Sequence, residues 1–309
     1  MIKILITGAN GQLGQCIIDS IKTYTGHDTF EYDAVDLPDM NISDTSHVKK
    51  YVEDGDYDYV INCAAYTNVG GCTDNEDAAI LANGYGPKIL AEACEKSKTR
   101  LIHISTDYVF DGSPELKTED SLTGPLNTYG RTKLLGETEI QNVAKRGNLE
   151  YMIIRTSWLY SEYGKNFVLT VLQNMKDGKT MNVVDDQFGT PTYAGDLAKF
   201  IITDVILGDD SNHTPFNSGI YHFSNLGYTT WYDFACEVLA AYKREAAKKS
   251  MLFGGVINPC KTSDYPTNVK RPKFGLLSKD KVLNIYHNFI PHWAWSVNRV
   301  VEKVFRFYV

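Results

Sequence analysis

The chain turns at Gly8-Ala9-Asn10-Gly11-Gln12-Leu13-Gly14, between an apolar run over 2–7 and an apolar-periodic segment over 12–21. This order predicts a strand, a tight turn and a helix in succession. Glycines there permit the turn, the close approach of backbone to a pyrophosphate and close helix–strand packing, and the helix N-terminus offers N–H groups to phosphate. The spacing is G-x-x-G-x-x-G rather than G-x-G-x-x-G, but its position favours a dinucleotide-binding loop. The residues expected to contact the cofactor here are Gly8, Asn10, Gly11, Gln12, Leu13 and Gly14.

The same alternation of strand and helix continues to about residue 156. Further strands are predicted over 29–35, 57–62, 100–105 and 150–156, and helices over 46–53, 77–96 and 129–145. Alternating strands and helices are typical of a parallel sheet covered on both faces. The predicted fold class is therefore α/β, a Rossmann-type doubly wound parallel sheet with a smaller C-terminal substrate-binding lobe.

The second half of the chain changes character, because aromatic and polar segments appear between the predicted helices 166–176, 194–206 and 231–243. We expect residues 1–156 to form the NAD(P)-binding domain, with later segments around 193–222 returning to it. Residues 157–309 would then form mainly the substrate-binding lobe.

The composition is that of a globular protein, with 309 residues of which 43% are hydrophobic and 22% charged. A net charge of -7 argues against a nucleic-acid partner. No run approaches ~18 apolar residues and no signal peptide is evident, so we expect a cytoplasmic protein without a membrane partner. The six cysteines are scattered without zinc-site spacing, so we expect reduced thiols and no metal.

Asp36 closes the second predicted strand, 22 residues after Gly14. A carboxylate at this place can accept hydrogen bonds from an adenosine ribose and repels a 2'-phosphate, which favours NADH over NADPH without excluding the latter. A solvated aspartate at a strand end is the alternative. Further cofactor contacts are expected at Asn41, Ile42, Ala64, Ala65 and Tyr66, although small residues at 64 and 65 are also compatible with plain core packing.

Tyr129 and Lys133 lie four residues apart at the start of a predicted helix and therefore share one face of it. An ammonium beside a phenol favours the ionised phenol and would lower its pKa toward the working pH, which suits proton transfer. Both residues are also expected to contact the cofactor. Thr106, after the preceding strand, places a hydroxyl at the same rim for a substrate oxygen, although such residues often only cap a turn.

Five segments together resemble the dTDP-4-dehydrorhamnose reductases, which are extended short-chain dehydrogenase/reductases. They are 8–14, Asn62-Cys63-Ala64-Ala65-Tyr66-Thr67, Ser105-Thr106-Asp107-Tyr108-Val109-Phe110-Asp111-Gly112, Tyr129-Gly130-Arg131-Thr132-Lys133 and Arg155-Thr156-Ser157-Trp158-Leu159-Tyr160. The similarity continues through 186–192 and 271–273, so it spans roughly residues 1–285.

The resemblance implies reduction of the 4-keto group of dTDP-6-deoxy-L-lyxo-4-hexulose (dTDP-4-dehydrorhamnose) to dTDP-L-rhamnose by NADH or NADPH. It makes Tyr129 the acid, Lys133 its electrostatic partner and Thr106 the hydrogen-bond donor to the substrate oxygen. Trp158 would face the sugar, with core packing as the alternative, and Arg271 would pair with the diphosphate or form a surface ion pair. A homodimer is also possible.

Two departures from the family pattern stand out. Val69 is followed by Gly70-Gly71-Cys72 where many members carry an aspartate, which removes a carboxylate near the substrate. Cys16 stands where some members have a glutamate implicated in a metal-linked dimer, so no such metal is expected.

Other functions stay open at this point. A 4,6-dehydratase is disfavoured because Asp107 is followed by Tyr108 rather than by a glutamate. Another nucleotide-sugar reductase or a 4-epimerase uses a similar Tyr and Lys. A non-catalytic regulatory subunit resembling the methionine adenosyltransferase beta subunit is the alternative from a different class.

Overall fold

The computed structural model describes residues 1–24, 29–211, 213–249, 254–265, 267, 269–287 and 289–307. Its centre is a six-stranded sheet in the order β10-β5-β4-β3-β1-β2, and all five strand pairs are parallel. The strands are β1 (Ile2–Thr7), β2 (Phe30–Val35), β3 (Tyr59–Asn62), β4 (Arg100–Thr106), β5 (Tyr151–Thr156) and β10 (Gly219–His222). The chain reverses its direction of winding between β1 and β3, which is where ligands of such sheets bind. The predicted doubly wound parallel sheet is confirmed.

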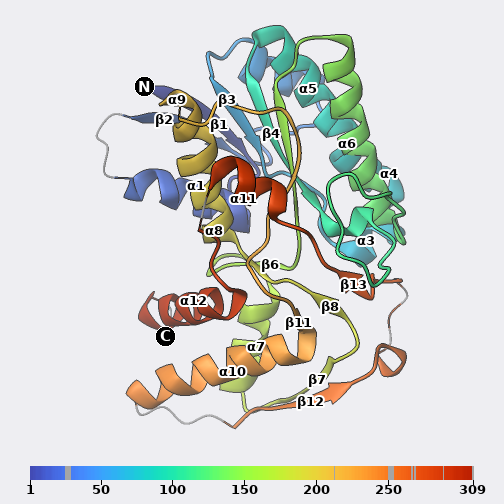
Figure 1. Ribbon diagram of the computed structural model, residues 1–309, viewed down its shortest axis with the longest axis vertical. Helices are drawn as coiled ribbons and strands as arrows, with labels where there is room; N and C mark the ends of the chain where they lie inside the picture. Colours follow the sequence, from blue (N-terminus) through green and yellow to red (C-terminus); the bar gives the residue numbers. More distant parts are fainter. Residues whose placement is uncertain are drawn as a thin grey trace.

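Side chains that alternate along β1 pack against helices on opposite faces of the sheet. Ile4 and Ile6 belong to the core under α1 (Gln12–Thr23), α8 (Ala194–Lys199) and η4 (Phe200–Ile206). Leu5 belongs to the core under α2 (Thr45–Val48), η1 (Lys49–Glu53), α5 (Gly86–Ser97) and α6 (Thr128–Arg146). Figure 1 shows α1 and α8 on one side of the strands and α5 and α6 on the other. Two separate apolar layers thus hold the sheet from both faces.

A second, smaller body lies below the sheet in Figure 1 and has its own apolar core. Its helices are α7 (Phe167–Lys176), α10 (Trp231–Lys248) and α12 (Trp293–Phe307). Its strands are β6 (Leu159–Tyr160) with β9 (Thr192–Tyr193), β7 (Thr180–Val184) with β12 (Val256–Cys260), and β8 (Phe188–Gly189) between β11 (Thr229–Thr230) and β13 (Phe274–Gly275). The remaining elements are α3 (Val69–Asp74), α4 (Glu76–Ile80), η2 (Leu81–Tyr85), η3 (Asp107–Val109), α9 (Leu207–Asp210), η5 (Thr262–Asp264) and α11 (Asp280–Tyr286).

Most predicted elements occur within one or two residues of their expected bounds. The helix predicted over 77–96 is three consecutive segments, α4, η2 and α5. The sixth strand, β10, was not predicted as a strand, because it has four residues and two of them are only partly buried. Such a short edge strand carries too little alternation to be distinguished from the loop before it.

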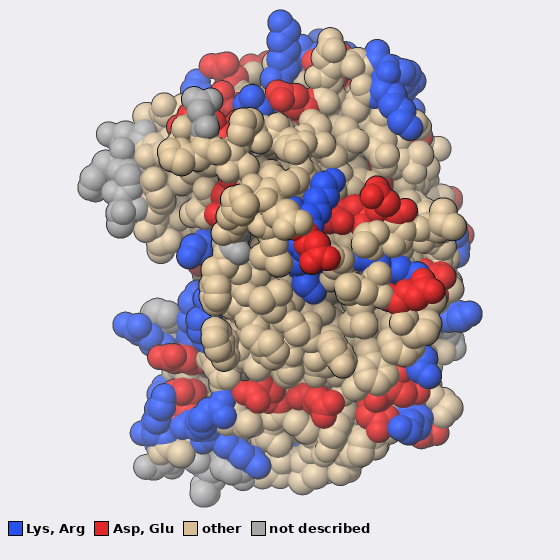
Figure 2. All heavy atoms as spheres, viewed as in Figure 1, with Lys and Arg blue, Asp and Glu red and all other residues tan. Residues whose placement is uncertain are grey.

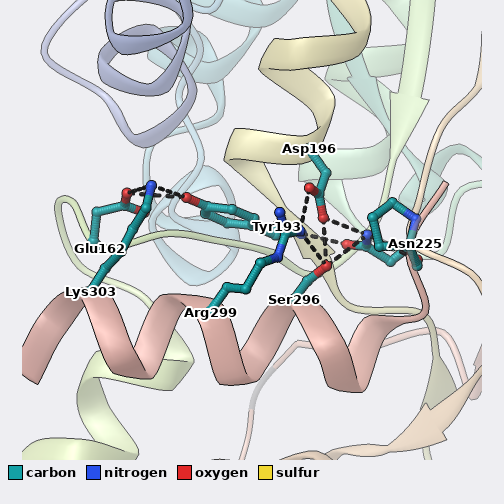
Figure 3. Close-up of polar contacts among 8 residues, drawn as sticks. Glu162, Tyr193, Asp196, Asn225, Ser296, Arg299 and Lys303 are labelled. Carbon is teal, nitrogen blue, oxygen red and sulfur yellow. Dashed lines mark hydrogen bonds and ion pairs between the residues drawn. The ribbon is translucent and has the colours of Figure 1, made fainter. Parts of the chain in front are cut away.

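Helix α12 is fastened to the rest of the molecule by a buried carboxylate (Figure 3). Asp196 of α8 accepts hydrogen bonds from Ser296 and Arg299 of α12, at 2.5 Å from each. Asn225, which follows β10, donates to the same carboxylate at 2.8 Å. Asp196 therefore joins α8, the chain beyond β10 and the C-terminal helix at one point.

A second contact from α12 holds the loop that precedes α7. Lys303 donates to Glu162 and to the hydroxyl of Tyr193, at 2.8 Å each (Figure 3). Glu162 lies directly before the segment 163–166, which leads into α7. The ion pair therefore ties the start of α7 to α12.

Candidate functional site

A cavity of about 970 Å³ opens at the carboxyl ends of β1, β3, β4 and β5, beside the second body. The structure brings most of the predicted site residues together around it. Those in its wall are Gly8, Gly11, Gln12, Leu13, Asp36, Asn41, Ile42, Ala64, Ala65, Tyr66, Thr106, Tyr129, Lys133, Trp158 and Arg271. Asn10 and Gly14 are not in the wall, and a contact of either residue with the cofactor stays a prediction.

The glycine loop leaves no room for side chains. Gly8 has a φ of +65°, and a Cβ on it would lie 2.5 Å from the backbone nitrogen of Ala64. A Cβ on Gly14 would lie 2.6 Å from the carbonyl oxygen of Gly8. Among the described residues no side chain caps the N-terminus of α1 at Gly11, which leaves its backbone N–H groups for a ligand. This backbone cradle fits the diphosphate of a nicotinamide dinucleotide.

Asp36 follows β2 directly and binds the loop itself. Its Oδ2 accepts from the backbone N–H of Asn10 at 2.9 Å and its Oδ1 from that of Leu37 at 2.8 Å. A carboxylate oxygen can accept more than one hydrogen bond, so a ribose contact stays a prediction. The carboxylate has a structural task in addition, which is to tie the glycine loop to the end of β2.

Tyr129 and Lys133 occupy the first turns of α6, as their spacing predicts. Asn127 caps this helix by accepting from the Gly130 N–H at 2.9 Å, and its side-chain N–H donates to the carbonyl of Lys270 at 2.9 Å. A Cβ on Gly130 would lie 2.2 Å from the carbonyl oxygen of Tyr108. The glycine after Tyr129 therefore allows α6 to approach the chain beyond β4.

The pKa of Tyr129 differs from the expectation. Burial raises this pKa well above the usual value for a phenol, and the neighbouring Thr106 hydroxyl offsets only part of the rise. The prediction that Lys133 lowers the pKa of Tyr129 was wrong. The Lys133 Nζ donates to the carbonyl of Ile104 at 2.7 Å, and burial of the phenol has the largest effect on its pKa. Burial also lowers the pKa of Lys133 to about 8, against the opposite effect of Glu137.

Thr106 and Asp107 follow β4 and form a second polar group in the cavity wall. The Thr106 hydroxyl donates to Asp107 at 3.1 Å and accepts from the Tyr108 N–H at 3.2 Å. Burial raises the pKa of Asp107 to about 7. A Cβ on Gly275 would lie 2.4 Å from an oxygen of this carboxylate. Asp107 is thus enclosed between the end of β4 and β13. Because its pKa is about 7, its carboxyl group can gain or lose a proton near neutral pH.

Trp158 stands at the side of the cavity nearer to the second body. Its ring stacks on that of Trp231 with 3.7 Å between centroids and 12° between planes. Trp231 in turn meets Phe167 edge-on at 4.8 Å. A Cβ on Gly189 would lie 2.4 Å from the Trp158 indole. Trp158 is therefore half-buried against aromatic neighbours and also lines the cavity. Its surroundings are compatible both with core packing and with the predicted contact to the sugar.

A family model described as RmlD substrate binding domain matches residues 2–306. The chain belongs to this family. It is 35% identical over 304 residues to the dTDP-4-dehydrorhamnose reductase of Aggregatibacter actinomycetemcomitans, covering 97% of this chain and 98% of that protein. It is 31% identical to the dTDP-4-keto-6-deoxy-D-glucose reductase of Streptomyces niveus, covering 96% and 95%. The predicted relationship to the dTDP-4-dehydrorhamnose reductases is confirmed, and so is the prediction that the chain is an oxidoreductase.

A solved relative carries a cofactor. The dTDP-4-dehydrorhamnose reductase of Bacillus anthracis, crystallised in complex with NADP, superposes with a TM-score of 0.83 at 31% identity and covers 98% of this chain and 100% of that chain. The fold of this RmlD family member thus has a counterpart in a structure that holds a nicotinamide dinucleotide.

Several cavity residues of this RmlD family member were not predicted. Among them are Asp107, Tyr108, Lys165, Asn166, Phe167 and Trp231. The segment 164–167 and the first residue of α10 reach the cavity from the second body, so no spacing along the sequence relates them to the glycine loop. Asp107 and Tyr108 could have been found, since they directly follow Thr106 at a strand end.

Two kinds of feature are absent from the part of the chain that the structure describes. No helix of that part is long and apolar enough to cross a membrane. Nor do three His, Cys, Asp or Glu side chains gather there in a way that would hold a metal ion. On the face drawn in Figure 2, acidic and basic side chains are interspersed with each other and separated by uncharged areas.

Proposed function

We propose that the chain reduces the 4-keto group of a nucleotide-linked deoxysugar with NADH or NADPH, and that its substrate is dTDP-4-dehydrorhamnose. The observation that carries the proposal is the convergence of Thr106, Tyr129 and Lys133 on the cavity that the glycine loop also enters. The names of the Aggregatibacter and Bacillus relatives support the choice of sugar. When bound, the reduced nicotinamide supplies the hydride.

In this proposal the residues of the chain divide the remaining work. The Tyr129 hydroxyl donates a proton to the oxygen that gains charge as the hydride arrives, and Thr106 donates a hydrogen bond to the same oxygen. Lys133 in its ammonium form stabilises the phenolate that Tyr129 becomes. Trp158 lies along the sugar, and Arg271 pairs with the diphosphate because a guanidinium matches phosphate oxygens.

The surroundings of Tyr129 agree with a role as acid. A phenol whose pKa is raised by burial keeps its proton until a stronger base appears, and the oxygen formed by hydride transfer is such a base. The raised pKa therefore suits a proton donor in the reductive direction.

A second candidate is another nucleotide-linked 4-keto sugar, which the Streptomyces relative favours because its name gives dTDP-4-keto-6-deoxy-D-glucose. The test is oxidation of NADH and of NADPH with a panel of dTDP- and UDP-linked 4-keto sugars. The expected result is turnover with dTDP-4-dehydrorhamnose that exceeds turnover with each other sugar. Faster turnover of another sugar would replace the substrate, and no turnover with any of them would overturn the proposed activity and favour the regulatory subunit.

A further inference from the structure

A chain of buried hydrogen bonds runs from the glycine-loop side of the cavity to Lys133. The backbone N–H of Ala64 donates to Oδ1 of Asn62 at 3.1 Å, and the Asn62 Nδ2 lies 2.9 Å from Nδ1 of His103. On the other side of this ring, Nε2 lies 3.3 Å from the Lys133 Nζ. Asn62 is 1% exposed and His103 is 0% exposed. The side chains of Asn62 and His103 therefore cannot turn to water for a partner.

The direction of every bond in this chain follows from its first member. A backbone N–H can only donate, so the Asn62 atom facing Ala64 must be oxygen and the atom facing His103 must be the amide nitrogen. That nitrogen donates, so Nδ1 of His103 must accept. Burial and Lys133 hold the pKa of His103 well below its usual range, so the ring is neutral and carries its one proton on Nε2.

The Nε2–H consequently points at the Lys133 amine. An uncharged amine satisfies this arrangement completely, because its lone pair accepts from His103 while one of its N–H groups donates to the carbonyl of Ile104 at 2.7 Å. An ammonium has no lone pair and sets two donors against each other. If the ring proton were on Nδ1 instead, the Nδ1–H would face the side-chain N–H of Asn62, and two donors would again oppose each other.

We propose that His103 is a positioning residue for Lys133, whose Nε2–H, oriented from Ala64 through Asn62, holds the Lys133 amine in place and favours its uncharged form. With a pKa of about 8, Lys133 is still mostly the ammonium at neutral pH, which is the form that the proposed mechanism uses on Tyr129. His103, which does not line the cavity, would then help to set the pH above which that ammonium is lost. The inference rests on the proposed function for this consequence alone, since the state of the amine can be measured without turnover.

Other groups that face Lys133 act on the same equilibrium. Glu137, one turn further along α6, and Cys63, after β3, both favour the ammonium. The Glu137 carboxylate is itself paired with Arg155 at 2.7 Å and accepts from Ser105 at 2.5 Å, so much of its charge is compensated. Tyr129 precedes Lys133 by one turn of α6 and stays protonated through neutral pH. His103 is thus the neighbour whose hydrogen-bond direction opposes the ammonium.

The experiment measures the titration of Lys133 directly, in the full-length protein labelled with 13C-lysine, by NMR of the side-chain Cε signal. Lys133→Arg identifies the signal. In the parent we expect a midpoint at about pH 8. His103→Phe keeps a ring without the N–H, and Asn62→Leu frees His103 to accept from the ammonium. In both variants the midpoint should rise by about one pH unit, the equivalent of one hydrogen bond.

Thr7→Val is the matched control, because Thr7 donates to the same Asn62 oxygen at 2.8 Å without setting its direction. Its midpoint should stay that of the parent. If His103 merely fills space, the more apolar variants should leave the midpoint unchanged or lower it, and either result overturns the proposal. If circular dichroism shows that one variant does not fold, the other variant is the test, and a rise in its Lys133 midpoint is again the expected result. An inactive parent with the expected shifts would sink the proposed function and leave this inference standing.

Discussion

Two sides of the cavity wall differ. Next to β1 and β3 the wall exposes backbone at glycine and alanine positions, whereas next to β4 and α6 it consists of buried polar side chains. On the first side, an added Cβ at Gly8 would strike the main chain of Ala64. On the second side, Lys133 is 2% exposed and Asp107 3% exposed, and burial shifts the pKa of each toward neutrality. The first side can hold a ligand through N–H groups alone, while the second can exchange protons.

This difference separates two kinds of energetic cost. Glycines lose more conformational entropy on folding than other residues do, but they leave nothing ionisable to desolvate. Buried titratable groups carry a desolvation cost that the fold has to offset through contacts such as the one between Lys133 and the Ile104 carbonyl. Variants on the two sides should therefore fail differently, in cofactor affinity on one side and in the rate of proton transfer on the other.

The largest effect is expected for Tyr129→Phe, which keeps the ring and removes the proposed acid. Turnover should fall by about 100- to 10,000-fold, the usual contribution of general acid catalysis, while NADH affinity stays within a few-fold of the parent. Steady-state kinetics and fluorescence titration with NADH measure the two quantities. Tyr228→Phe is the control, since that ring is 67% exposed and should leave both unchanged. Turnover within threefold of the parent in Tyr129→Phe would sink the mechanism.

The next largest effect is expected for Gly8→Ala on the backbone side. The positive φ costs about 1–2 kcal/mol of folding stability for a residue with a Cβ. Relief of the contact with the Ala64 backbone must also shift the glycine loop, and a loss of about 1.4 kcal/mol of binding free energy from that shift would lower NADH affinity about tenfold. Turnover at saturating NADH should change much less. Isothermal titration calorimetry with NADH provides the test.

Gly178→Ala is the matched control for that variant, because Gly178 has a φ of +68° and an added Cβ meets nothing within 4 Å. Both variants should lose stability, but only Gly8→Ala should lose cofactor affinity. Equal affinity in the two variants would show that the close approach of Gly8 to Ala64 does not shape the cofactor site.

The two sides also differ in how much the sequence could predict. The glycine loop is a local signal, because the turn, the helix start and the missing side chains follow one another within seven residues. Tyr129 and Lys133 could be placed on one helix face by spacing, but the pKa of the phenol depends on how deeply α6 packs, which no spacing encodes. Trp231 was missed for a similar reason, since it meets Trp158 only through tertiary packing of the second body.

A smaller effect is expected for Trp158→Ala, which sharpens the distinction between the cofactor side and the sugar side of the cavity. An aromatic contact is worth about 0.5–1.5 kcal/mol beyond its area, so the KM for the sugar nucleotide should rise about two- to twelvefold with NADH affinity unchanged. Trp295→Ala, at a site 62% exposed on α12, is the control for loss of an indole. An equal loss of NADH affinity, or an unchanged KM, would return Trp158 to a core-packing role.

The smallest effect is expected for Asp36→Ala, which tests whether the carboxylate acts on the ribose or only on the glycine loop. Its removal should shift the ratio of kcat/KM for NADH over NADPH toward NADPH by about threefold, the worth of one modest hydrogen bond. Because Asp36 also accepts from the Asn10 N–H, kcat/KM for both cofactors should fall together as the loop loosens. Asp39→Ala removes an exposed carboxylate three residues on and controls for net charge. A fall for both cofactors with an unchanged ratio would leave Asp36 as a loop anchor, and the backbone side of the cavity would then discriminate between the two cofactors by some other group.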